Sequence, residues 1–392
     1  MNLLRARVPH KRVIACCTLA FMCGVAFACQ SIIGLEAPQE TPDPCAHRQI
    51  PAPPTTDDDD GTAVPVQWYA VRTANIFVDP QMQTPGYDLD GVCTCQDGGA
   101  GARGAVDSCE PYKTDPQCDY AEGIDNGLRR FVESQSQLAG AGVSLQSLGI
   151  DDRAKGGQNT ILVYLGDWNG KANDRSVNVG TLTSQGLAAV NNCTGAVPQA
   201  STDGGTLPIP TGGPHWDGCD RWSAAASQVV SQPPLTRPTI TSGGYVTNGV
   251  IVVSPKSGGT TSLAVLGYPI TVSAANSTFN VRDGGLQATV SGRLDPLSVL
   301  GAIGAANITT GSPPLCQTPL FGTLVEAVCA QLDIANQQTN DFKKAKCDGL
   351  SAAMSLTAVP TLPPISVPDP SSISTPCKGV IGDSVSSLCG NR

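Results

Sequence analysis

The sequence predicts a mainly β protein with some α structure: an antiparallel β-sandwich with a disulfide-rich insert and a small helical C-terminal cap. Three observations support this prediction. Short β-branched runs, separated by Gly, Pro and Asn, recur between residues 245 and 292, which is typical of antiparallel sandwiches. Four cysteines lie within residues 86–122, and apolar residues at helical spacing follow residue 296.

The first 28 residues have the layout of a bacterial export signal. A basic head without acidic residues precedes an uncharged stretch, residues 13–28, which is shorter than the roughly 20 apolar residues of a membrane-spanning helix. The stretch ends in Ala26-Phe27-Ala28, the small-x-small pattern that precedes signal cleavage. Residues 1–28 are therefore predicted to be a removable signal peptide.

Cleavage after Ala28 would make Cys29 the first mature residue, the position that carries lipid in bacterial lipoproteins. The motif is imperfect, because Ala26 and Phe27 stand where Leu and a small residue are usual. Beyond Cys29, the mature chain keeps an even number of cysteines, which can pair without a free thiol in an oxidising compartment. We expect lipid on Cys29. The alternative is plain secretion, with Cys29 unpaired or bonded to another molecule.

The rest of the chain divides into three parts. Residues 29–62 are predicted to be a lipid-attached disordered spacer, because prolines and the acidic run 57–60 leave few apolar side chains to pack. The β-rich domain is expected at 63–295, with the insert at 86–122. A helical, disulfide-tied cap and tail are expected at 296–392.

The first strands of the β-rich domain are expected within residues 64–78, where the chain becomes apolar and β-branched. A helix is expected after the insert, because Ile124, Leu128, Phe131 and Val132 fall on one helical face. Further strands are expected at residues 160–165 and 176–182, followed by a loop-rich stretch at 184–240.

The clearest hairpin surrounds Asn248-Gly249, a dipeptide that adopts positive φ at both positions of a two-residue turn. Strands are expected on either side of it, at residues 245–246 and 250–253. Four more strands are expected at residues 262–266, 269–274, 278–282 and 286–292. In the cap, Leu324, Val325, Val328 and Leu332 are spaced for one helical face.

Eleven cysteines are disulfide candidates: Cys93, Cys95, Cys109, Cys118, Cys193, Cys219, Cys316, Cys329, Cys347, Cys377 and Cys389. Cys93 and Cys95 point to the same side of an extended strand, so a bond between them would be strained. If the insert pairs internally, these two bond to Cys109 and Cys118 in either order. Cys193 is expected to pair with Cys219, and Cys377 with Cys389.

The insert also holds the densest group of carboxylates, and Asp88, Asp90 and Asp97 are the candidate metal ligands. Carboxylates spaced two apart beside glycine can surround Ca²⁺, which accepts six to eight oxygen ligands. An EF-hand starting at Asp88 fails, because it needs Gly at Cys93 and Glu at Gly99. The alternative is a disulfide knot with acidic turns and no ion.

The sequence offers no catalytic set. A Ser-His-acid triad would have to use His215, which lies in a loop with two tryptophans and Cys219. That loop could bind a sugar or shield a disulfide. The net charge of −9 becomes more negative once the basic signal is removed, which excludes nucleic acid as a favoured partner. The membrane is then contacted only through the lipid.

Several short segments resemble a group of uncharacterised, cysteine-containing secreted lipoproteins of myxobacterial type. The matching segments are residues 29–35, 88–95, 123–127, 161–179 and 347–351. The resemblance implies export, an envelope location and lipid on Cys29, and it implies no catalytic residue.

The leading hypothesis is a lipid-anchored envelope protein, either an outer-membrane lipoprotein or extracellular, with a non-enzymatic binding or structural role. Its partner would be a carbohydrate or another envelope protein, and calcium is the one candidate cofactor. The alternatives are a secreted hydrolase of polysaccharide or ester, and a calcium-stabilised adhesion or carbohydrate-binding protein.

Overall fold

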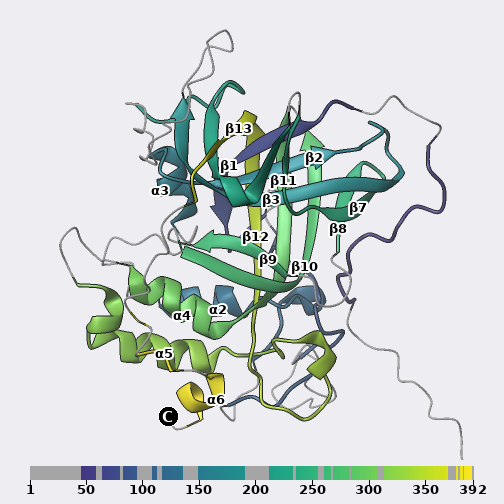
Figure 1. Cartoon of the computed structure of the whole chain (residues 1–392). Coiled ribbons are helices and arrows are strands. Elements are labelled where there is room, and N and C mark those ends of the chain that lie inside the picture. The colour runs from purple at the N-terminus through teal and green to yellow at the C-terminus, as the bar shows by residue number, and fades with distance from the viewer. Residues whose placement is uncertain are drawn as a thin grey trace, which may run out of the picture. The chain divides into compact units, whose positions relative to one another are not determined.

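The structure is a computed structural model, shown in Figure 1. No helix among its described residues is long and apolar enough to cross a membrane. It describes residues 46–58, 64–79, 83–94, 108–112, 117–135, 149–189, 212–232, 235–254, 260–265, 268–282, 284–306, 313–369, 377, 380–382 and 384–390.

Eight strands form a closed β-barrel rather than the predicted sandwich. Their order is β3-β2-β1-β12-β11-β10-β8-β7, and β7 pairs back onto β3. Every pairing in this ring is antiparallel. The strands are β1 (Gln67–Asn75), β2 (Ile161–Gly166), β3 (Asp174–Ala189), β7 (Ser242–Thr247), β8 (Val250–Val253), β10 (Tyr268–Arg282), β11 (Gly285–Leu294) and β12 (Leu350–Pro360).

The barrel closes because two of its strands are long and irregular. β3 has 16 residues and β10 has 15. The register shifts between Asp174 and Val177 in β3 and between Ser273 and Asn276 in β10. Such irregularities bend a strand and increase its twist, so the sheet curls until β3 meets β7. The sandwich prediction is wrong because alternating runs are common to sandwiches and barrels.

The side chains of β1 and β2 alternate between two cores. In β2, Ile161, Val163 and Leu165 belong to the main core, whereas Leu162 and Tyr164 point to the opposite face. The opposite face of β1–β3 is covered by a smaller core that includes Trp68 and Trp222. The ring of Trp68 meets that of Tyr164 edge-on, with 5.2 Å between centroids.

Among the described residues, five further strands lie outside the ring. β4 (Arg221–Ala225) pairs with the C-terminal half of β3, and β13 (Leu362–Val367) pairs in parallel with β4. β9 (Thr260–Val265) pairs with β10, while β5 (Val229–Gln232) and β6 (Leu235–Pro238) form a separate hairpin. The predicted Asn248-Gly249 hairpin is confirmed: it joins β7 to β8, with φ of 51° and 80° at the turn.

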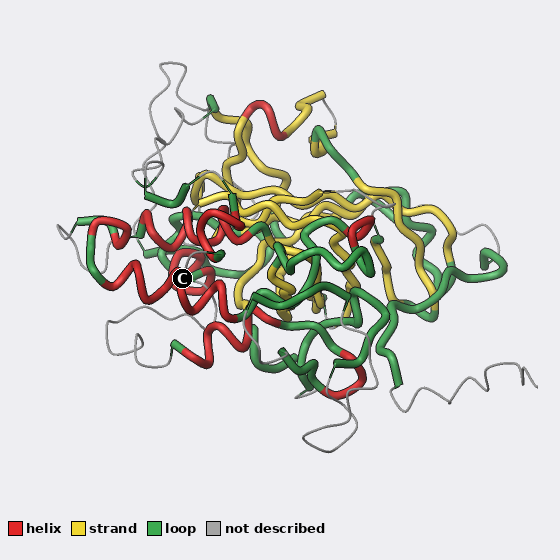
Figure 2. The backbone as a smooth tube through the Cα atoms, turned by 90° about the horizontal axis from the view of Figure 1, so that it is seen from below, coloured by secondary structure: helices red, strands yellow, loops and turns green. Residues whose placement is uncertain are grey.

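The helices gather beside the strands, as Figure 2 shows. In Figure 1, α2 (Gly127–Ser134), α4 (Pro296–Ala305), α5 (Leu320–Ala330) and α6 (Val385–Cys389) lie together below the sheet. α3 (Ile150–Lys155) packs against β1. The Asp295 carboxylate caps α4 by accepting from the Leu297 and Ser298 amides.

The predicted cap at residues 296–392 is only partly helical. It contains α4, α5 and α6, but it also supplies β12, which lies in the barrel between β1 and β11. The sequence of β12 is rich in Ala and Ser, so it lacks the β-branched run that marks a strand. Its place in the barrel comes from partners far away in the sequence.

Residues 46–58, within the predicted spacer 29–62, lie against the domain. The Arg48 amide donates to the Glu122 carbonyl over 2.8 Å, and the Tyr245 hydroxyl donates to the Pro51 carbonyl. The Asp57 carboxylate accepts from the Arg175 backbone and side chain. Backbone and carboxylate hydrogen bonds therefore hold this stretch against the domain. Residues 29–45 lie outside the described residues.

Candidate metal centre

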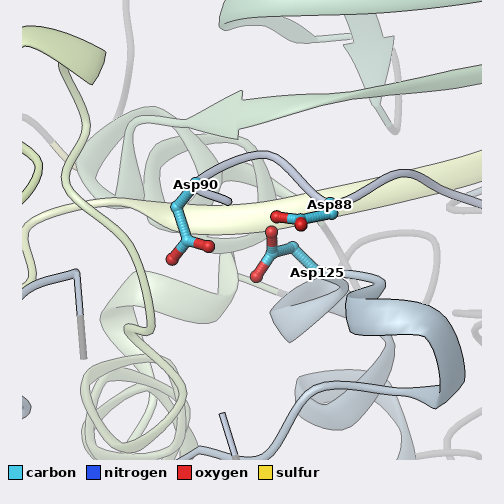
Figure 3. Close-up of side chains that lie close together, drawn as sticks. All are labelled: Asp88, Asp90 and Asp125. Carbon is cyan, nitrogen blue, oxygen red and sulfur yellow. The ribbon is translucent and has the colours of Figure 1, made fainter. Parts of the chain in front are cut away.

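Three aspartates form the aspartate cluster: Asp88, Asp90 and Asp125. One oxygen from each carboxylate lies within 4.8 Å of the others, and Figure 3 shows the three side chains converging from two segments of the chain. Asp88 and Asp90 stand in the loop 87–94, and Asp125 stands just before α2. Asp88 and Asp125 are buried, and Asp90 is half-buried.

Close backbone approach brings these two segments together. Gly86 has φ of +130°, and a Cβ there would lie 2.8 Å from both the Ala353 Cβ and the Ile124 Cγ2. Only glycine tolerates that conformation and that distance. The Asp125 amide then donates to the Tyr87 carbonyl over 3.2 Å, and the Leu89 amide donates to the Asp125 Oδ2 over 2.6 Å.

Local turns fix the two carboxylates of the loop. The Gly91 amide donates to the Asp88 Oδ1 over 2.6 Å, and the Val92 amide donates to the Asp90 Oδ1 over 2.9 Å. Aspartate side chains favour such turns by bonding to backbone amides two or three residues later. The second oxygen of Asp88 contacts the His47 Nδ1.

Two further aspartates flank the cluster. Asp119 accepts from the Thr94 amide over 2.6 Å. Asp333 pairs with the Arg130 guanidinium and accepts from the Ser351 amide over 2.9 Å. Their charges act on the cluster, because buried carboxylates repel one another when both are ionised.

Burial and repulsion raise three carboxyl pKa values. Burial raises the pKa of Asp90 to about 6, and the charges of Asp88 and Asp333 add to this, while the Ser108 hydroxyl and the Val92 amide oppose it. Burial raises the pKa of Asp119 to about 8, with further contributions from Asp90 and Asp333. Burial, followed by the same negative neighbours, raises the pKa of Asp125 well above its ordinary value.

A buried arginine anchors the loop without neutralising the cluster. One Arg293 Nη donates to the Leu89 carbonyl over 2.9 Å, while both Nη atoms bind the Asp341 carboxylate over 2.7 and 2.6 Å. Because Asp341 already balances its charge, Arg293 positions the backbone of the loop. The Arg293 side chain is fully buried.

A polar cavity of about 370 Å³ adjoins the cluster. Asp88 and Asp90 line it, together with side chains that carry amide or hydroxyl oxygens: Gln49, Tyr87, Ser254, Asn276 and Gln338. Asp90, which is half-buried, is therefore the carboxylate of the cluster that this cavity opens to solvent and small cations. The cavity also provides room for water ligands beside the protein oxygens.

The geometry of the cluster fits a hard cation such as Ca²⁺. Oxygen ligands lie about 2.3–2.6 Å from Ca²⁺, so two ligand atoms of one ion are at most about 5 Å apart. The 4.8 Å limit of the cluster satisfies this condition. The remaining ligands that Ca²⁺ requires would be water or backbone carbonyls.

The sequence predicted part of this site. It singled out Asp88 and Asp90, which the structure brings together, whereas Asp97 lies outside the described residues. It did not assign Asp125 as a ligand, although this residue follows the same acidic stretch. His47 and Asp333 carried no sequence signal, because one lay in the predicted spacer and the other in the predicted cap.

The disulfides of the described cysteines differ from the predicted pairs. Cys109 bonds to Cys347 rather than within the insert. Cys377 and Cys389 bond to Cys316 and Cys329 rather than to each other. These pairings are set by packing between distant segments, which sequence spacing cannot reveal.

The remaining candidate cysteines are only partly placed. Cys93, Cys118 and Cys219 are each disulfide-bonded. Cys29, Cys95 and Cys193 lie outside the described residues. The Cys93 Sγ is 3.7 Å from the His47 Nδ1, beside the aspartate cluster.

The loop of His215 is organised around a carboxylate. The Asp220 side chain accepts from the His215 and Trp216 amides over 3.1 and 2.7 Å, so its oxygens bind backbone groups in this loop. The Trp216 ring lies 5.9 Å from the Trp222 ring, centroid to centroid. These contacts fit a loop that covers the smaller core beside the bonded Cys219.

No family model, curated protein or solved structure matches the chain.

Proposed function

We propose that this chain is an exported, lipid-anchored envelope protein that acts by binding rather than by catalysis, and that a calcium ion at the aspartate cluster stabilises it. The convergence of Asp88, Asp90 and Asp125 within 4.8 Å carries the proposal. An ion there would join the loop 87–94 to the segment that starts α2.

Charge balance supports a cation at this place. Arg130 pairs with Asp333, and His47 contacts Asp88. Asp90 and Asp125 have no ion-pair partner among the residues that the structure describes. Buried carboxylates without a cation must take up protons or repel one another. A divalent ion removes this cost, and the adjoining cavity gives it access.

The envelope location is proposed on the N-terminal sequence. A basic, uncharged and small-residue pattern ends at Ala28, and Cys29 follows it. Mass spectrometry of the N-terminal peptide from bacterial membranes is expected to show a diacylglyceryl group on Cys29. An unmodified Cys29 at the mature N-terminus would refute the anchor and leave secretion.

Thermal unfolding of the full-length protein tests the calcium site. At about pH 8, added Ca²⁺ is expected to raise Tm by roughly 3–8 °C at a hundred times its dissociation constant, because only the folded state has the site. A chelator should reverse the shift. Mg²⁺ should give a smaller one, since it demands a tighter octahedral geometry.

Two variants show whether the calcium-induced rise in Tm comes from the aspartate cluster or from a general effect of surface charge. Asp90→Asn keeps an oxygen for the Val92 amide but removes one ligand charge, so the calcium shift should disappear. Asp152→Asn removes an exposed carboxylate in α3 and should leave the shift unchanged. Equal shifts in both variants, or no shift in the parent protein, would contradict the proposal.

A further inference from the structure

A second cavity, of about 450 Å³, opens into the barrel itself. Val163, Val179, Phe279, Val290 and Leu356 line it from five strands of the ring, and all five also belong to the main core. Eight-stranded barrels are just wide enough to be filled by side chains or to hold one small ligand. This barrel leaves part of its interior open.

The entrance lies where β3 parts from β7. Their pairing ends at Val179 opposite Ser242, and β3 next pairs with β4 from Ser184 onward. Residues 180–183 therefore have no strand partner on this side among the described pairings. Gly180, Leu182 and Ser242 line the cavity at this seam.

The segment around β6 stands over the seam. A Cβ on Gly180 would lie 2.5 Å from the Pro238 Cγ, so the glycine allows this segment to sit close against β3. Ile240, at the same entrance, is 80% exposed. A large apolar side chain at the mouth of an apolar cavity favours the entry of an apolar molecule.

The lining specifies the charge of the occupant. Every described residue that lines the cavity is apolar or an uncharged Ser, Thr or Gln. An ionised head group would lose its hydration there without a compensating charge. A neutral molecule is therefore favoured over a carboxylate of the same length.

The side chain of Gln228 indicates that the ligand carries a hydrogen-bond donor. Gln228 lines the cavity, and its buried Oε1 has no hydrogen-bond partner among the described residues. A buried acceptor without a donor costs about 1–3 kcal/mol. A ligand hydroxyl or N–H at this place would remove that cost.

The geometry points to a binding site, inside the barrel, for a small neutral aliphatic or aromatic molecule that carries one hydrogen-bond donor. The donor binds the Gln228 Oε1, and the apolar body lies against Val163, Phe279 and Leu356. The volume falls within the range of about 300–1,000 Å³ typical of small-molecule pockets. This inference rests on the proposed binding role and names the class of its ligand.

Fluorescence of N-phenyl-1-naphthylamine, an uncharged aromatic amine, provides the test on the full-length protein. The dye is expected to brighten and saturate at one site, and decanol should displace it. Nonyl methyl ether, an isomer of decanol without a donor, should displace it about 3- to 10-fold less well, since one net hydrogen bond is lost. Decanoate should be weaker than decanol.

Three variants locate the site. Ser277→Leu fills the cavity from β10 and should weaken dye binding at least tenfold. Thr289→Leu makes a similar change on β11, at a position outside the cavity lining, and should have no effect. Gln228→Met removes the acceptor at similar size and should equalise decanol and its ether isomer.

Several results would overturn the inference: no dye binding to the parent protein, dye binding unchanged by Ser277→Leu in a protein with the parent circular dichroism spectrum, or equal displacement by decanol and the ether. If Ser277→Leu does not fold, the comparison of decanol with the ether in the parent protein still tests the inference. Such failures would leave the calcium shift and the Cys29 peptide as separate tests of the proposed function.

Discussion

The backbone amide of Leu89 donates a hydrogen bond to the Asp125 carboxylate over 2.6 Å. This bond joins the loop 87–94 to the start of α2, and it brings three carboxylates within reach of one ion. A single hydrogen bond contributes about 1 kcal/mol, which is small beside the repulsion of several buried carboxylates. The cluster is therefore expected to respond strongly to protons and to metal.

The metal-free protein is expected to lose stability as pH rises from about 4 to about 8. The pKa values of Asp90 and Asp119 are raised to about 6 and about 8, and that of Asp125 is also raised. Between the unfolded and folded pKa values, the folded state holds more protons, so raising pH favours unfolding. Urea unfolding with a chelator, repeated across this range, measures the slope.

Calcium is expected to reverse this dependence. Its ligands must be deprotonated, so its apparent affinity rises as pH passes the folded pKa values. The stabilisation by Ca²⁺ should therefore be larger at about pH 8 than at about pH 5. A calcium effect that is independent of pH would show that the raised carboxyls are not its ligands.

Asp90→Asn is expected to stabilise the metal-free protein while removing its calcium response. At about pH 8 the substitution relieves an unfavourable buried charge whose pKa is raised to about 6, a gain of about 1–3 kcal/mol. Urea unfolding with and without Ca²⁺ measures both effects in one series. Lower stability of the variant in chelator would contradict the repulsion that this prediction assigns to the ionised Asp90.

Arg293→Met is expected to destabilise the protein by about 3–5 kcal/mol, because it leaves Asp341 buried without its partner. It should also weaken calcium binding, since the Leu89 carbonyl loses its donor and the loop 87–94 loses an anchor. Arg282→Met, at the exposed end of β10, is the matched control. Calcium affinity unchanged in a folded Arg293→Met protein would separate Arg293 from the site.

The disulfides are expected to differ in whether they stabilise the whole fold or only the C-terminal helix. Cys109–Cys347 joins the segment at 108–112 to the stretch before β12, over a separation of 238 residues, and replacing both with Ala should cost about 2–5 kcal/mol of global stability. Replacing Cys329 and Cys389 should mainly free α6 from α5. Limited proteolysis with mass spectrometry distinguishes global unfolding from release of the C-terminal helix.

Local patterns explain what the sequence could predict. Asn248-Gly249 predicted its hairpin because the turn needs positive φ at both positions, which these residues adopt readily. Asp88 and Asp90 were found because aspartates beside glycine favour turns that gather carboxylates. Each of these features depends on neighbours within a few residues.

The features that the sequence could not predict depend on contacts between distant segments. Barrel closure depends on β3 meeting β7, and β12 enters the ring only through β1 and β11. Asp333 and His47 reach the aspartate cluster from segments far from it in sequence. Periodicity within a strand does not show which strand it pairs with, so neither the barrel nor these residues could be predicted.

Isothermal titration of Ca²⁺ into the full-length protein at about pH 8 tests the central claim most directly. We expect one ion per chain in the parent protein and in Asp152→Asn, and no measurable binding in Asp90→Asn or Asp125→Asn. A site that survives both cluster substitutions, or a parent protein that binds no calcium, would contradict the account.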